Sequence, residues 1–185
     1  MISGTTGSLT PPIVCFVGRS GAGKTTVIES VVAELKRRGL KVGVIKHDAH
    51  DFEMDRPGKD TWRFSQAGAD AVAISSPRKV ALIERVEREW PLDEVVALLR
   101  ERVDIVLAEG YKRDASKPKV EVSRAEVGGP LLCSDEELWA VVADWAPPTT
   151  APRFTSSQPG RLVDLLLEKT GLASGGPATT SPQHK

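Results

Sequence analysis

The residues best able to do chemistry form one run near the start of the chain. The run reads Gly18-Arg19-Ser20-Gly21-Ala22-Gly23-Lys24-Thr25 and matches the phosphate-binding P-loop pattern. Its glycines permit backbone angles that turn successive N–H groups inward, and a following helix adds partial positive charge toward bound phosphates. Lys24 is predicted to reach the β- and γ-phosphates, Thr25 to coordinate Mg²⁺, and Thr26 to bond the α-phosphate side. The sequence therefore predicts a site for a purine nucleoside triphosphate with Mg²⁺.

Two carboxylates are candidates for the metal side of this site. Glu109 follows the apolar run 104–108, where an acid at the carboxyl end of a strand would hold Mg²⁺ directly or through water and orient an attacking water. Asp48 lies just beyond a second strand and could face the γ-phosphate or the metal. The alternatives are an exposed acid at a turn for Glu109 and a solvated loop carboxylate for Asp48. Glu109 and Lys24 are the candidate catalytic residues.

Two histidines, His47 and His50, flank Asp48 and raise the hypothesis of a transition-metal site. Two histidines without a third ligand nearby do not complete a zinc site. A contact with the phosphate side or with a partner is the favoured interpretation.

The base that the site selects depends on Asp144, which follows the apolar run 138–143. An aspartate can accept hydrogen bonds from the N1–H and the exocyclic amino group of guanine, whereas adenine offers no matching pair of donors. This interpretation favours GTP. A helix cap or turn residue before Pro147-Pro148 is the alternative role for Asp144.

Elements that would position these residues alternate along the chain. Apolar runs predict strands at 13–17, 41–46, 104–108 and 138–143, and Val120 and Val122 indicate an edge strand. Helical spacing predicts helices over 27–38, 61–67, 92–103 and 162–167. Residues 69–75 and 79–85 predict a hairpin. The fold class is therefore α/β, a P-loop three-layer sandwich with a mostly parallel sheet and a small β-hairpin insertion.

Composition limits the remaining choices. One domain over 13–172 is expected, with disordered tails at 1–12 and 173–185 that are rich in small and polar residues. Lys plus Arg equal Asp plus Glu at 25 each, which provides no basic excess for nucleic acid or anionic lipid. No apolar run is long enough to span a bilayer, and two dissimilar cysteines do not suggest disulfides, so a cytoplasmic protein is expected.

Several short segments together resemble one known family, the MobB adaptor proteins of molybdopterin-guanine dinucleotide biosynthesis. The resemblance covers about residues 13–169. The segments that carry it, beside the loop 18–26, are Lys46-His47 with His50, Phe52 and Asp55, Pro57-Gly58-Lys59-Asp60-Thr61, Arg63 with Ala67-Gly68-Ala69, Glu109-Gly110-Tyr111-Lys112, and Pro118-Lys119-Val120-Glu121-Val122. Asp48-Ala49 and Phe64-Ser65 depart from residues that relatives often carry.

The resemblance implies a GTP-binding protein with weak GTPase activity, usually a homodimer. It would assist a MobA-type guanylyltransferase in attaching GMP to the molybdenum cofactor, with molybdopterin as a candidate ligand. The main alternative is a small-molecule kinase, although no Arg-rich lid is visible in the sequence. A metal-delivery GTPase is the third hypothesis.

Overall fold

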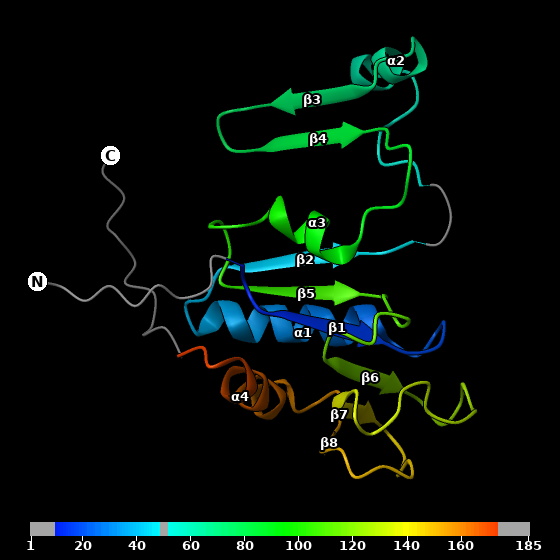
Figure 1. The fold of residues 1–185 in the computed structure, drawn as a ribbon, viewed down its shortest axis with the longest axis vertical. Helices are drawn as coiled ribbons and strands as arrows, with labels where there is room; N and C mark the ends of the chain where they lie inside the picture. Colours follow the sequence, from blue (N-terminus) through cyan, green and yellow to red (C-terminus); the bar gives the residue numbers. More distant parts are fainter. Residues whose placement is uncertain (1–9, 49–51, 174–185) are drawn as a thin grey trace, which may run out of the picture. The chain divides into compact units, whose positions relative to one another are not determined.

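The computed structural model describes residues 10–48 and 52–173 (Figure 1). Residues 1–9 and 174–185 of the predicted tails lie outside these ranges, as does His50. Within the range predicted as one domain, the contacts group into two compact units. We call residues up to His47 and from Leu92 the main unit, and residues 48–91 the insert unit, and describe each by itself.

The main unit is built on a sheet of six parallel strands in the order β2-β5-β1-β6-β7-β8. The strands are β1 (Ile13–Val17), β2 (Val42–Lys46), β5 (Ile105–Glu109), β6 (Lys119–Ser123), β7 (Leu138–Ala143) and β8 (Arg153–Phe154). Consecutive strands are joined by crossovers, as a parallel sheet requires. The predicted α/β fold class with its mostly parallel sheet is confirmed.

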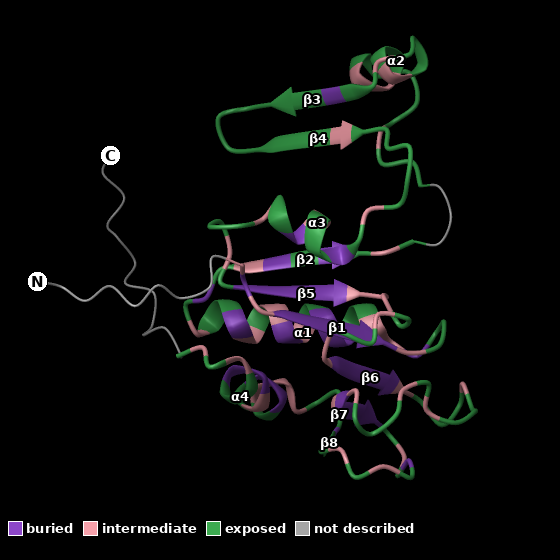
Figure 2. Cartoon of the chain, in the orientation of Figure 1, coloured by how far each residue is buried: buried purple, intermediate pink, exposed green. Residues whose placement is uncertain are grey.

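Helices and loops bury both faces of this sheet. Val14 and Phe16 of β1 belong to one core cluster, whereas Ile13, Cys15 and Val17 belong to another, because successive strand residues point to opposite faces. Residues of α1 (Lys24–Arg37) and α4 (Pro159–Thr170) complete the first cluster, and residues of α3 (Leu92–Ala97) complete the second. Figure 2 shows β1, β5 and β6 as largely buried. The continuous apolar runs of the sequence are thus explained by burial on both faces.

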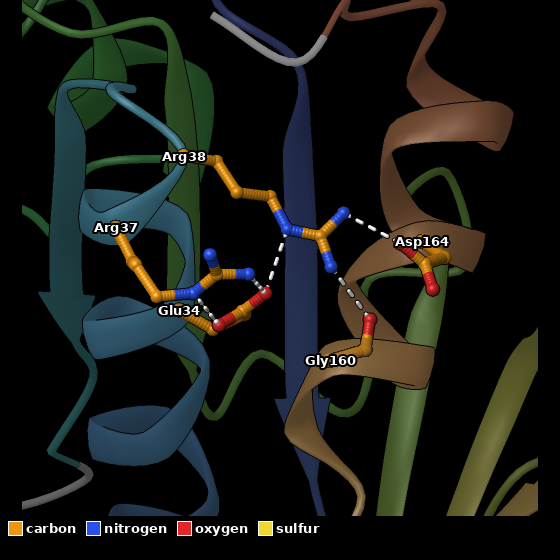
Figure 3. Close-up of polar contacts among 5 residues, drawn as sticks. All are labelled: Glu34, Arg37, Arg38, Gly160 and Asp164. Carbon is orange, nitrogen blue, oxygen red and sulfur yellow. Dashed lines mark hydrogen bonds and ion pairs between the residues drawn. The ribbon is translucent and has the colours of Figure 1, made fainter. Parts of the chain in front are cut away.

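An ionic network ties α1 to α4 (Figure 3). The Arg38 guanidinium donates to Glu34 Oε1 at 2.8 Å, to Asp164 Oδ1 at 2.6 Å and to the Gly160 carbonyl at 2.9 Å. Arg37 donates to both carboxylate oxygens of Glu34. Hydrogen bonds from Arg37 and Arg38 lower the pKa of Glu34 from 4.5 to about 2. The network links two helices that cover the same face of the sheet.

The insert unit contains α2 (Asp60–Gln66) and an antiparallel hairpin of β3 (Ala71–Ser75) and β4 (Val80–Glu84). The predicted hairpin is confirmed, and it forms a separate two-stranded sheet. Its apolar side chains are mostly uncovered in the described chain, since Ile74 is 58% exposed, Val80 74% and Leu82 57% (Figure 2).

The prediction of an edge strand at Val120 and Val122 is wrong. β6 lies between β1 and β7 and is buried. Lys119 and Glu121, which alternate with these valines, are buried and paired. Lys119 Nζ donates to the Asp114 carbonyl and to Glu137, and the Glu121 carboxylate accepts the backbone N–H groups of Leu132 and Cys133. Charged side chains can be buried when ion pairs and hydrogen bonds replace the water they lose.

Two boundaries also differ from the prediction. The helix predicted over 92–103 ends at Ala97, because the N–H groups of Leu98, Leu99 and Arg100 donate to carbonyls three residues back instead of four, and Glu101 then adopts a φ of 61°. In the predicted tail, Pro11 is buried, and the Pro12 carbonyl accepts the Val106 N–H at 2.9 Å. No helix within residues 10–48 and 52–173 is long and apolar enough to cross a membrane.

Candidate functional site

The glycine-rich run forms the loop between β1 and α1. Gly18 has a φ of 146°, and a Cβ at this position would lie 2.2 Å from the Val122 carbonyl oxygen of β6, so only glycine fits. Gly23 has a φ of 87° and precedes the first residue of α1. The loop therefore packs directly on the neighbouring strand and leads into a helix N-terminus, as the P-loop pattern predicts.

Lys24, the first residue of α1, folds back over the loop. Its Nζ donates to the Gly18 carbonyl at 3.2 Å and to the Arg19 carbonyl at 3.1 Å. Phosphate oxygens accept stronger, charge-assisted hydrogen bonds than neutral carbonyls do. The ammonium group is thus held where it can exchange these carbonyls for a bound phosphate.

Glu109 and Thr25 meet beside the loop. β5 pairs with β1 in a register that places Glu109 opposite Phe16, and Gly110 N–H donates to the Phe16 carbonyl at 3.0 Å. As a result, Thr25 Oγ1 donates to Glu109 Oε2 at 3.2 Å, although the residues are 84 positions apart. A hydroxyl and a carboxylate are oxygen ligands of the kind that Mg²⁺ prefers, so the pair fits such an ion.

His47 and Asp48, two residues with predicted roles, directly follow β2. His47 N–H donates to the Glu109 carbonyl at 2.9 Å, and its ring centroid lies 4.8 Å from that of Tyr111. Asp48 is an exposed residue of the insert unit, and its role as a metal ligand stays a prediction. Over the described ranges, no group of three His, Cys, Asp or Glu side chains could hold a metal ion. The transition-metal hypothesis, which involves His50, gains no support from these ranges.

A pocket of about 170 Å³ opens beside the loop. Gly23 and Thr26 line it on one side, and Asp144 lines it at the end of β7, with Thr155 and Ser156 nearby. Pockets for drug-sized ligands measure roughly 300–1,000 Å³, so this one suits a single ring system such as a base. Asp144 thus lies beside the loop at the carboxyl edge of the sheet, and its contact with a guanine base stays a prediction.

Asp144 is also structural. Its Oδ1 accepts the backbone N–H of Ala125 at 2.8 Å, which fixes the segment after β6. Sequence reasoning missed this contact and missed Arg124, which lines the same pocket. It also missed the link from the Arg19 side chain to the Pro130 carbonyl, at 3.3 Å. The sequence offers no clear signal for this region, because only the tertiary partners of Lys119 and Glu121 show that both charges are buried and that β6 is an inner strand.

A parallel sheet, a glycine-rich loop packed between β1 and α1, and an acid at the end of the adjacent strand define the P-loop class of α/β proteins. Residues 13–144 match the family described as MobB, molybdopterin guanine dinucleotide synthesis protein B. The chain belongs to this family, and the resemblance noted in the sequence is confirmed.

Individual relatives agree with the family match. The chain is 35% identical over 135 residues to a molybdopterin-guanine dinucleotide biosynthesis adapter protein of Haemophilus influenzae, covering 72% of this chain and 75% of that protein. It is 35% identical over 106 residues to the adapter protein of Escherichia coli, covering 56% of this chain and 61% of the relative, which is less than two thirds. The crystal structure of Bacillus subtilis MobB superposes with a TM-score of 0.67 at 30% identity, covering 85% of this chain and 97% of that one.

Proposed function

We propose that this chain binds GTP with Mg²⁺ at the loop 18–26 and acts as an adaptor for a MobA-type guanylyltransferase, which attaches GMP to molybdopterin. Family membership assigns the chain to molybdopterin-guanine dinucleotide biosynthesis as an adaptor. The observation that carries the nucleotide part is the contact between Thr25 and Glu109 beside the loop. This contact brings together two oxygen ligands from distant segments at the point where a triphosphate would end.

Each part of the nucleotide has a group to receive it in this proposal. Loop N–H groups and Lys24 bind the β- and γ-phosphates, and Thr26 binds the α-phosphate side. Thr25 and Glu109 hold Mg²⁺, which would neutralise phosphate charge. Asp144 Oδ1 accepts the Ala125 N–H, and Oδ2 is the oxygen that would accept hydrogen bonds from the guanine donors.

Slow GTP hydrolysis is part of the proposal. The Glu109 carboxylate is oriented toward Thr25 and hence toward the metal side of the site. A carboxylate committed to a cation is a poor base for an attacking water, because the cation lowers its proton affinity. Binding, more than rapid turnover, is then the useful property of the site.

A homodimer is also proposed, with the insert hairpin as the contact. A two-stranded hairpin alone is marginally stable in water, and the apolar side chains of Val80 and Leu82, which the strand register places on one face of the hairpin, are exposed. A second copy of the chain would cover them. Sedimentation of the wild type and of Leu82→Lys tests this, with a dimer expected only for the wild type and a monomeric wild type contradicting it.

A cytoplasmic location completes the proposal. Cys15 and Cys133 are free thiols, as in proteins of reducing compartments. Burial raises the pKa of the Cys15 thiol to about 11, and burial with the nearby Glu121 carboxylate raises that of Cys133 to about 12. Both thiols therefore stay protonated and have low nucleophilicity at neutral pH.

The adaptor role is tested by forming the guanine dinucleotide cofactor with purified guanylyltransferase, with and without this chain, in the presence of GTP and Mg²⁺. We expect the chain to raise the yield, and Lys24→Ala to raise it less. No stimulation at any protein ratio, together with rapid phosphate transfer from a nucleotide to a small acceptor, would overturn the adaptor role and favour a small-molecule kinase.

A further inference from the structure

Arg124 follows directly on β6 and lies against the phosphate loop. A Cβ at Gly23 would be 3.2 Å from Arg124 Nη2 and 3.3 Å from its Nε, so the guanidinium occupies the space over this glycine. The same side chain lines the pocket that Thr26 and Asp144 share. Arg124 thus stands at the junction between the phosphate loop and the pocket for the base.

A hydrogen bond to the backbone next to Arg124 fixes the position of this residue at the junction. Asp144 Oδ1 accepts the N–H of Ala125, the next residue, at 2.8 Å. The placement of the guanidinium is therefore coupled to the residue proposed to select the base. The segment that carries Arg124 is held in place by this hydrogen bond.

The present partner of the guanidinium is weak enough to exchange. Arg124 Nη1 donates to Glu126 Oε1 at 3.2 Å, and the two side chains are 44% and 71% exposed. Exposed ion pairs contribute little, because water and salt screen them. By contrast, Nη2 and Nε are the guanidinium nitrogens that face Gly23. A phosphate beside Gly23 could accept hydrogen bonds from both.

We propose that Arg124 binds the α-phosphate of the nucleotide through Nη2 and Nε. The inference rests on the proposed nucleotide site and extends it. With the terminal phosphates near Lys24 and the base near Asp144, the phosphate that passes Gly23 is the one attached to the sugar. Arginine suits this place because its planar fork can donate two parallel hydrogen bonds to a phosphate.

Titration of the full chain with GTP and with GDP, in the presence of Mg²⁺, tests the assignment. The variants are Arg124→Ala and Arg124→Lys, with Arg161→Ala as the control because Arg161 is an exposed arginine of α4. We expect Arg124→Ala to weaken GTP and GDP by the same factor, about tenfold or more. Arg124→Lys should recover part of this loss because it retains the charge, and the control should bind as the wild type does.

Three results would overturn the assignment. Unchanged affinity in Arg124→Ala would mean that the guanidinium does not touch the nucleotide. A loss for GTP alone would move the contact to the γ-phosphate. Equal losses for the Ala and Lys variants would indicate stacking on the base, where a lysine is a poor substitute. Failure of the wild type to bind either nucleotide would instead refute the proposed function, so the two failures are distinguishable.

Discussion

Replacement of Asp144 by asparagine separates its two proposed tasks. The amide oxygen of asparagine can still accept the Ala125 N–H, which the aspartate holds at 2.8 Å, so the segment after β6 should keep its place. The other position changes from a carboxylate oxygen to an amide N–H₂ group, which is a donor. The N–H₂ group of the asparagine would then face the N–H donors of guanine, and two donors cannot form a hydrogen bond with each other.

The expected loss of GTP affinity follows from the replacement of one hydrogen-bond acceptor by a donor. A hydrogen bond to a charged group contributes about 1.5–3 kcal/mol, so GTP should bind about 10- to 150-fold more weakly to Asp144→Asn. Affinity for ATP should hardly change, because adenine offers no donor pair there. Xanthosine triphosphate should gain affinity, since xanthine carries a carbonyl where guanine carries its amino group.

Calorimetric titration with the three triphosphates and Mg²⁺ measures these affinities, and thermal unfolding checks that the fold is retained. Asp144→Ala is the companion variant, because it also leaves the Ala125 N–H without its acceptor and should unfold at a lower temperature than Asp144→Asn. Wild-type affinity for GTP in Asp144→Asn would refute the role in base recognition. Equal losses for GTP and ATP would show that the substitution had distorted the site.

Three further variants test other parts of the structure. Lys24→Ala should lose most triphosphate binding and stay folded, because the hydrogen bonds that Nζ makes in the described residues go to the loop carbonyls of Gly18 and Arg19. Calorimetry measures the binding, and circular dichroism checks the fold. Glu109→Gln should bind GTP nearly as the wild type does, because the loop and Lys24 still hold the phosphates, but hydrolyse it several-fold more slowly, because a neutral amide holds Mg²⁺ less firmly; phosphate release records the rate. The pKa of Glu34 is lower in the folded chain, about 2, than its ordinary 4.5. Wild-type stability should therefore fall as pH drops from 4.5 toward 2, and Glu34→Gln should show a flatter decline in urea unfolding across this window.

Much of the main unit could be predicted because parallel strands carry a strong sequence signal. Continuous apolar runs at 13–17, 104–108 and 138–143 mark strands buried on both faces. The carboxyl ends of such strands share one edge, which is why Glu109 and Asp144 could be placed near the loop before the structure was known.

β6 shows where the same reasoning failed. Its alternation of Lys119 and Glu121 with valines is the usual pattern of a half-exposed strand, and only tertiary partners reveal that both charges are buried. An edge strand would end far from the loop, so the error also concealed Arg124. The early end of α3 was also hidden, because the apolar spacing of Leu99 and Val103 is the same whether the chain continues as an α-helix or tightens into turns with i→i+3 hydrogen bonds.

Titration of the wild-type chain with GTP and with ATP, each with Mg²⁺, is the most direct test of the central claim. The arrangement of Lys24, the Thr25 and Glu109 pair, and Asp144 predicts one nucleotide per chain with GTP bound more tightly than ATP. Absence of binding for both nucleotides, or ATP bound at least as tightly as GTP, would contradict it.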